Sequence, residues 1–213
     1  FYCLNHKEIM RTALFYDAET TGLPLFKEPS SHPDQPHIVQ LAAFLVDLDT
    51  RETLSSMDVI VRPEGWTIPD DMTSIHGIST QKALDFGIPE AQAVDMLLAL
   101  HSNATVRIGH NEQFDARVVR IGAKRFIDPR EPDEDLPMSD EWKAGAAECT
   151  ARLATPICKL PPTAKMRGGN KTPTLLEAYQ YFFGQDFPGQ HTARGDALAC
   201  MRVYFAIQDQ AKK

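Results

Sequence analysis

The chain has only four cysteines in 213 residues, and no two of them form a CxxC pair. This excludes the usual spacing of a zinc ribbon or a dithiol redox motif, and it favours free thiols in a reducing compartment. No apolar run approaches the ~20 residues of a membrane span. The first residues, FYCLNHKEI, lack the basic and apolar blocks of a signal peptide. These absences predict a cytoplasmic protein with no membrane partner.

The composition is that of an ordinary globular domain, with 43% hydrophobic and 24% charged residues. A chain of this length is long enough for one domain with a sizeable core. Met10 is a plausible natural start. We therefore expect an N-terminal extension at 1–9 and a single domain at 10–213.

Positive charge is scarce overall, because the net charge is −7, but the two signs are segregated along the chain. Seven acids and one arginine lie between Asp128 and Glu141. From Cys149 to Leu176 there is no acid, while five basic residues occur: Arg152, Lys159, Lys165, Arg167 and Lys171. This basic stretch is suited to meeting a polyanion, and a solvated loop is the alternative on charge alone.

Hydrophobic periodicity predicts an α/β domain. We expect strands at 14–16, 38–47, 54–62 and 105–109, the second and third forming a hairpin. Helices are expected from Pro89-Glu90 to about Leu100 and at 111–122, 151–158, 174–183 and 192–208. In the helix at 111–122, Asn111 is expected to be the N-cap and Gly122 to end the helix. The acidic, Pro-rich segment 123–148 is predicted to be irregular, and 159–173 to be a loop.

Two acids stand together in the stretch TALFYDAETTGLP at the end of the first strand. Asp17 and Glu19 are two residues apart, so on a strand they point to the same face. Like charges are tolerated there when a hard divalent cation neutralises them. A strand end with two solvated acids is the competing interpretation.

Two further segments carry acids close to predicted helix starts. GHNEQFD (109–115) places Asp115 on a helix directly after a strand, and HTARGD (191–196) places His191 and Asp196 at the entrance of the last helix. Each signal is weak alone, because a helical Asp or a loop His is most often a surface residue. Their joint occurrence, in this order, points to a site.

DAETTG, HNEQFD and HTARGD together resemble the three motifs of the DEDDh 3′–5′ exonucleases, a family that includes the proofreading epsilon subunit of bacterial replicative polymerase. SIHGIS (74–79) also resembles a family segment. The resemblance spans about 12–208 and implies a ribonuclease H-like exonuclease fold, with a mixed five-stranded sheet flanked by helices. In that fold the second strand runs antiparallel to its neighbours.

The chemistry of phosphodiester hydrolysis fits these residue types. Two divalent cations, Mg²⁺ or Mn²⁺, can activate water and stabilise the leaving oxygen, and Mg²⁺ prefers oxygen ligands. We assign Asp17, Glu19, Asp115 and Asp196 to the metals, with Asp17 bridging both. His191 is assigned as general base, because histidine accepts protons near neutrality. The resemblance implies the same roles.

Substrate contacts are expected at several further residues. Thr20, Thr21 and Gly22 should lie along the terminal nucleotide, Leu23 should wedge against the last base and Phe114 should stack on it. Core packing is the alternative for Leu23 and Phe114. The SIHGIS resemblance implies that His76 contacts the substrate backbone, and helix capping is the alternative for this residue. Asn111, Lys165, Arg167 and Lys171 complete the candidate substrate-binding set.

The function expected is a 3′–5′ exonuclease that acts on single-stranded DNA 3′ ends and releases nucleoside 5′-monophosphates. The alternatives are an exoribonuclease acting on RNA or short oligoribonucleotides, and a non-catalytic nucleic-acid-binding domain. DAETTG is closer to the DNA-proofreading branch than to the oligoribonuclease branch. Few residues follow the last predicted helix, so a polymerase partner has no support in this sequence.

Overall fold

A computed structural model describes residues 10–130 and 137–212. The expected extension at 1–9, with Cys3, and the acids between 131 and 136 lie outside the described residues. No helix in the described part of the chain is both long and apolar enough to cross a membrane.

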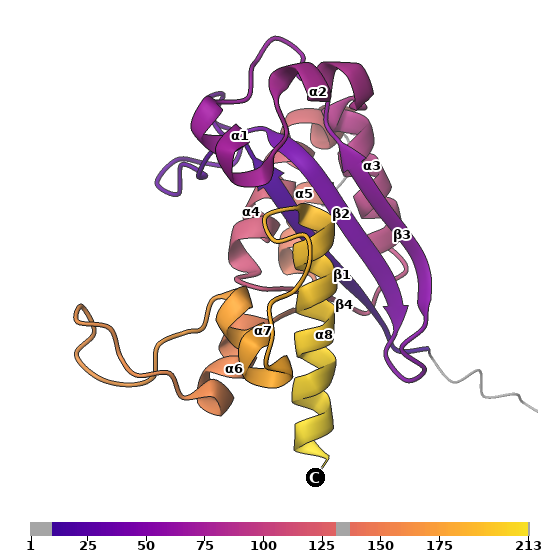
Figure 1. Cartoon of the computed structure of the whole chain (residues 1–213). Coiled ribbons are helices and arrows are strands. Elements are labelled where there is room, and N and C mark those ends of the chain that lie inside the picture. The colour runs from indigo at the N-terminus through magenta and orange to yellow at the C-terminus, as the bar shows by residue number, and fades with distance from the viewer. Residues whose placement is uncertain (1–9, 131–136, 213) are drawn as a thin grey trace, which may run out of the picture.

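A five-stranded sheet in the order β3-β2-β1-β4-β5 forms the centre of the domain (Figure 1). Its strands are β1 (Thr12–Thr20), β2 (Ile38–Asp47), β3 (Thr53–Ile60), β4 (Val106–Gly109) and β5 (Ala147–Cys149). β2 is antiparallel to β1 and β3, whereas β4 is parallel to both β1 and β5. The expected mixed α/β sheet of the ribonuclease H-like exonuclease fold is thus confirmed.

Helices cover both faces of the sheet. The helices are α1 (Asp70–His76), α2 (Thr80–Phe86), α3 (Glu90–His101), α4 (Gln113–Gly122), α5 (Met138–Ala144), α6 (Thr150–Cys158), α7 (Leu175–Phe183) and α8 (Ala193–Ala211). One face, with Leu14 and Tyr16 of β1, packs against α3, α4 and α5. The other face, with Ala13 and Phe15, packs against α8. Alternate residues of β1 therefore belong to two different cores, so odd-numbered positions face α8.

The boundaries of α4 differ from those predicted. Asn111 is not the N-cap: it has a positive φ of 65°, and Glu112 precedes the first helical residue. Gly122 does not stop the helix, because the chain continues into a π-helical turn at Ala123–Ile127 and a 3₁₀ turn at Asp128–Arg130. A Cβ at Gly122 would lie 2.7 Å from Val94 Cγ2, so this glycine allows α4 to approach α3 closely.

The prediction of an irregular segment at 123–148 was wrong for most of its described residues, because it contains these turns, α5 and β5. Trp142 of α5 is buried beside Tyr16, and this tertiary contact explains a helix in a stretch rich in acids and prolines. The first strand is also longer than predicted and carries Asp17 and Glu19 within it. α1 and α2 were not predicted, although Gly77 and Ser79 cap them.

Candidate active site

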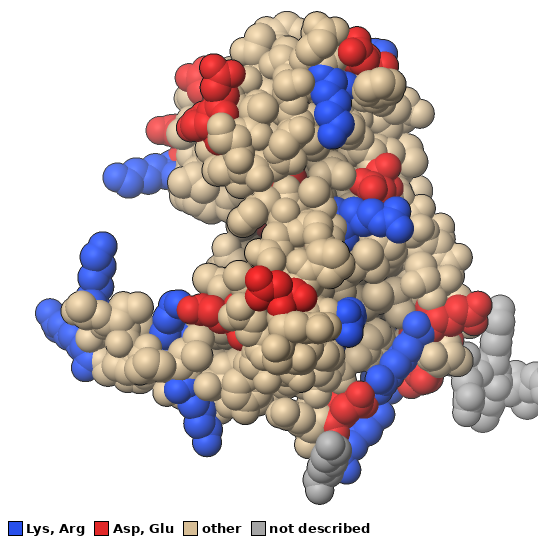
Figure 2. Space-filling model, in the orientation of Figure 1, with Lys and Arg blue, Asp and Glu red and all other residues tan. Residues whose placement is uncertain are grey.

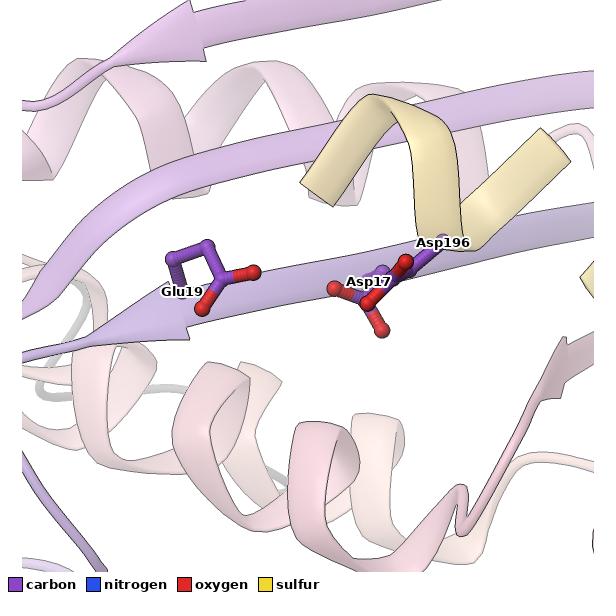
Figure 3. Close-up of side chains that lie close together, drawn as sticks. All are labelled: Asp17, Glu19 and Asp196. Atoms are coloured by element: carbon purple, nitrogen blue, oxygen red, sulfur yellow. The ribbon is translucent and has the colours of Figure 1, made fainter. Parts of the chain in front are cut away.

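Three carboxylates converge where β1 meets the start of α8. Asp17 and Glu19 lie on the face of β1 that α8 covers, and Asp196 belongs to the first turn of α8. Their carboxylate oxygens lie within 4.8 Å of one another. Figure 3 shows the two side chains from the strand and the one from the helix directed into the same space.

Burial raises the pKa of every carboxyl in this group, and the charges of neighbouring acids add to the rise for Asp17 and Glu19. Burial, followed by the charges of Asp115, Asp196 and Glu19, raises the pKa of Asp17 well above its usual value. The pKa of Glu19 rises to about 7, through burial and then the charge of Asp196. Burial raises the pKa of Asp196 to about 6. Ionising all three at neutral pH is therefore unfavourable without a compensating positive charge.

Asp115 borders this group from α4. Its side chain is buried, and its Oδ1 accepts a hydrogen bond from the backbone N–H of Ala18, 3.1 Å away. Burial raises the pKa of Asp115, while this hydrogen bond opposes the rise. Ala18 lies between Asp17 and Glu19, so the bond holds the two acidic segments together.

The donor set suits a hard divalent cation. Asp17, Glu19 and Asp196 offer carboxylate oxygen and no thiolate or imidazole, which is the chemistry preferred by Mg²⁺ and Mn²⁺. One oxygen of Asp196, Oδ1, is buried and has no hydrogen-bond partner among the described residues. An orphaned buried carboxylate oxygen is costly, and a bound cation would satisfy it.

His191 lies at the edge of the carboxylate group, on the loop that enters α8. Its side chain is exposed, and its backbone N–H hydrogen-bonds to Asp196. Its backbone has a positive φ of 60°, as does that of Asn111, at 65°. Left-handed φ values are uncommon outside glycine and are frequently found at functional positions. The motifs HNEQFD and HTARGD thus each combine a residue of left-handed backbone with an aspartate of the site, Asp115 or Asp196.

Gln40 is a positioning residue that the sequence did not single out. Its Oε1 accepts a hydrogen bond from the backbone N–H of Ala193, the first residue of α8, and its Nε2 donates to Asp58 Oδ1. Gln40 also lies opposite Glu19 in the β1–β2 register. The available signal was a lone polar residue inside the apolar strand IVQLAAFLVD, because buried polar groups need partners.

A second buried network supports the turn between β4 and α4. Tyr16 donates its hydroxyl hydrogen to Glu112 Oε1, and Arg107 pairs with the same oxygen at 2.7 Å. The Arg107 guanidinium also lies over the Trp142 ring and donates to the carbonyl oxygen of Trp142. Sequence reasoning passed over Glu112, whose burial became visible only with the tertiary structure.

The residues after Glu19 form a tight turn. The Thr20 hydroxyl donates to the carbonyl oxygen of Gly22, and the Thr21 hydroxyl accepts from the backbone N–H of His37. Leu23 is 76% exposed, so it is not part of the core. Its side chain is therefore free to contact a ligand.

Phe114 and His76 are placed differently. Phe114 is half-buried and packs against the core on the α3–α4 face of the sheet. His76 is buried at the end of α1, where its Nδ1 accepts a hydrogen bond from the backbone N–H of Ile78. This is the local bond expected of a residue that terminates a helix. Its Nε2 has no partner among the described residues.

Residues 159–173, which we call the basic arm, project from the domain between α6 and α7 (Figure 1). A backbone bridge joins Leu160 and Lys171 at its base. Lys171 forms an ion pair with Glu177, whereas Lys165 and Arg167 are exposed, with no side-chain partner in the part of the chain described. Figure 2 shows lysine and arginine at the tip of the arm, and a hollow between the arm and the body of the molecule.

Comparison with known proteins supports the relationship that the motifs imply. A family model named RNase_T, described as exonuclease, matches residues 14–204. No protein of curated function has a detectable sequence match to this chain.

Solved structures of Exonuclease I resemble this domain. The zinc-bound complex of Escherichia coli Exonuclease I with single-stranded DNA has a TM-score of 0.69 at 18% identity, covering 96% of this chain and 42% of that one. The E. coli enzyme with a dT13 oligonucleotide gives 0.67 at 19% identity, covering 93% and 41%. Exonuclease I from Methylocaldum szegediense gives 0.68 at 21% identity, covering 95% and 41%.

This chain therefore spans less than half the length of those neighbours. The similarity to Exonuclease I shows that the fold is the same. It does not show a specific relationship to the epsilon subunit. The family model covers most of the chain and includes all five predicted catalytic residues. The chain belongs to the RNase_T family of exonucleases.

Proposed function

We propose that this domain is a metal-dependent 3′–5′ exonuclease that degrades single-stranded DNA from its 3′ end and releases nucleoside 5′-monophosphates. The observation that carries the proposal is the group of three partly buried carboxylates, with one oxygen from each lying within 4.8 Å of the others, bordered by Asp115. The single-stranded DNA seen in the E. coli Exonuclease I complexes is consistent with this substrate.

Asp17, Glu19, Asp115 and Asp196 would hold two divalent cations, Mg²⁺ or Mn²⁺. When bound, such ions supply positive charge for the attacking and leaving oxygens of the phosphodiester. The protein contributes a rigid arrangement of its ligands. Gln40 holds the start of α8 and Ala18 holds Asp115, so the acids are positioned before substrate arrives.

His191 would accept the proton of the attacking water. It lies on an exposed loop next to Asp196, and its side chain is free to approach the substrate from solvent. The water oxygen would bond to phosphorus as the bond between phosphorus and the 3′ oxygen of the preceding nucleotide breaks. The nucleoside 5′-monophosphate would leave, and the departing 3′ oxygen would take up a proton, so that the shortened strand ends in a new 3′ hydroxyl.

A single strand would be held on both sides of the carboxylates. Leu23 is exposed next to the turn that contains Thr20, Thr21 and Gly22, where it can contact the terminal base. The basic arm supplies Lys165 and Arg167, which are both exposed. A basic surface that follows the backbone is one of the usual means of binding single strands without sequence preference, and Leu23 would add an apolar contact to the last base.

Matched oligonucleotides test the proposal directly. Single-stranded DNA, duplex DNA and RNA of one sequence, each labelled at the 5′ or the 3′ end, are incubated with Mg²⁺, Mn²⁺ or EDTA. We expect a ladder from 5′-labelled single-stranded DNA, immediate release of a labelled mononucleotide from 3′-labelled DNA, and no cleavage in EDTA. Faster degradation of RNA would contradict the DNA assignment, and a ladder from the 3′ label would contradict the polarity.

A further inference from the structure

His110 connects the active-site region with the base of the basic arm. Its ring is partly buried directly after β4, and both ring nitrogens are engaged. Nε2 lies 3.0 Å from the carbonyl oxygen of Pro173, and Nδ1 lies 2.9 Å from Thr150 Oγ1. A carbonyl only accepts, so Nε2 carries the proton. Burial lowers the pKa of His110 to about 4, so the ring is neutral near pH 7 and Nδ1 is the acceptor for the Thr150 hydroxyl, which also lies 3.3 Å from the carbonyl oxygen of Gly109.

The partners of His110 belong to different elements. Thr150 is fully buried at the start of α6, and its hydroxyl lies 3.4 Å from the thiol of Cys200 on α8. Pro173 ends the basic arm, directly before Thr174 caps α7. One ring therefore joins the turn after β4 to α6, and joins the base of the arm to both of them.

Few other hydrogen bonds hold the arm, although Leu160 at its base packs against the core shared by α6, α7 and α8. Within the described residues, its remaining hydrogen bonds are made inside the arm or to α6 and α7, such as Lys171 N–H to Leu160 O and Lys171 Nζ to Glu177. These bonds give the arm its own shape. The His110–Pro173 bond is the one that ties its base to the β4–α4 turn, and α4 carries Asp115.

We propose that His110 is a positioning residue that sets the direction of the basic arm relative to the carboxylates. In this arrangement Lys165 and Arg167 meet the strand whose 3′ end lies at Asp17 and Glu19. The inference rests on the proposed function, because it assumes that the arm contacts substrate. A substrate long enough to reach the arm depends on the His110–Pro173 bond, whereas a dinucleotide held at the carboxylates does not.

Two substitutions of His110 separate its two hydrogen bonds. The side-chain amide nitrogen of glutamine can occupy nearly the position of imidazole Nε2, so His110→Gln retains a donor for Pro173. Asparagine is too short to reach Pro173 but keeps a polar group beside Thr150. His110→Asn should therefore release the base of the arm, and His110→Gln should hold it.

We expect His110→Asn to raise KM for a 12-nucleotide single strand by about five- to tenfold, the usual effect of losing one buried hydrogen bond. Its kcat, and both constants for a dinucleotide, should stay within about twofold of the parent. His110→Gln should resemble the parent on both substrates. Equal losses in the two variants, or equal losses on long and short substrates, would overturn the inference.

Thr150→Val gives a second test that leaves His110 itself unchanged. It removes the hydroxyl beside Nδ1 and is close to the native residue in shape, while the bond from Nε2 to Pro173 remains. Like His110→Gln, it should leave KM for the long strand within about twofold of the parent. A selective rise in KM for the long strand in folded Thr150→Val would show that the Pro173 bond does not set the direction of the arm, and would overturn the inference.

Hydrogen exchange distinguishes failure of this inference from failure of the proposed function. Without metal or substrate, His110→Asn should speed exchange of the Lys171 amide at the base of the arm and leave α8 protected. Unchanged exchange would overturn the role of His110 whatever the activity. A different outcome is faster exchange in His110→Asn while Lys165→Gln/Arg167→Gln leaves KM for the long strand unchanged. In that case the arm does not contact substrate, and the inference that depends on this contact is wrong.

Discussion

Gln40 holds the first residue of the last helix: its Oε1 lies 3.1 Å from the backbone nitrogen of Ala193. Gln40 is also the register partner of Glu19 on β1, so the residue beside one β1 acid is hydrogen-bonded to the helix that carries Asp196. Gln40 thus connects β1, which carries Asp17 and Glu19, with α8, which carries Asp196.

Replacing Gln40 with leucine should impair catalysis more than folding. We expect metal affinity to fall by about 10- to 100-fold, as for other groups that orient metal ligands, and the free energy of unfolding to fall by about 1–3 kcal/mol. Calorimetric titration of Mn²⁺ and urea unfolding measure the two effects. Asp58→Asn, which leaves an acceptor for Gln40 Nε2, is the control and should bind metal much better than Gln40→Leu.

Replacing any one of Asp17, Glu19, Asp115 and Asp196 with its amide should lower kcat by at least about 100-fold. In metal-free buffer near pH 8 the same proteins should be more stable than the parent, because a buried charge has been removed. Thermal unfolding in EDTA and cleavage assays in Mg²⁺ test both effects. An Asp17→Asn protein with most of its activity would rule out the metal assignment.

The metal-free protein should lose stability as the pH rises from about 4 to 7. The pKa is raised to about 7 for Glu19 and to about 6 for Asp196, whereas carboxyls in an unfolded chain titrate near ~4. The folded state therefore binds more protons in this window, and stability falls with increasing pH. Saturating Mg²⁺ should flatten the profile, and identical profiles with and without metal would contradict this account.

His191→Ala should reduce turnover by about 10²- to 10⁴-fold, the range for loss of a general base. Metal affinity should change little, because the side chain of His191 is not part of the carboxylate group. Titration of Mn²⁺ into the variant checks this directly. Loss of metal binding would instead identify His191 as a ligand.

Lys165→Gln/Arg167→Gln should weaken binding of single-stranded DNA uniformly across sequences. If both side chains contact phosphates, the slope of log K against log salt should become shallower by roughly 1.4, about 0.7 for each lost contact. Binding is measured across a salt series in EDTA to prevent cleavage. Lys171→Gln is the matched control, because the charge of Lys171 is already paired with Glu177. If Lys171→Gln changed the salt dependence as much as Lys165→Gln/Arg167→Gln, direct contact of Lys165 and Arg167 with phosphates would be contradicted.

Local patterns in the sequence determined much of this protein. The apolar run 38–47 formed β2 with the predicted bounds, because strand periodicity and turn residues act over short distances. The position of Asp17 and Glu19 on one face of β1 followed from the two-residue repeat of a strand. Family membership likewise followed from three short motifs, whose residue types are required by the chemistry.

Only the tertiary structure decided what depends on partners distant in the chain. Met138–Ala144 is helical because Trp142 packs on Tyr16, which an acidic, Pro-rich stretch does not reveal. Gln40 and His110 gain their roles from Ala193 and Pro173, far along the sequence. Periodicity records which face of an element is buried, whereas the partner of a buried polar atom is set by how the elements pack.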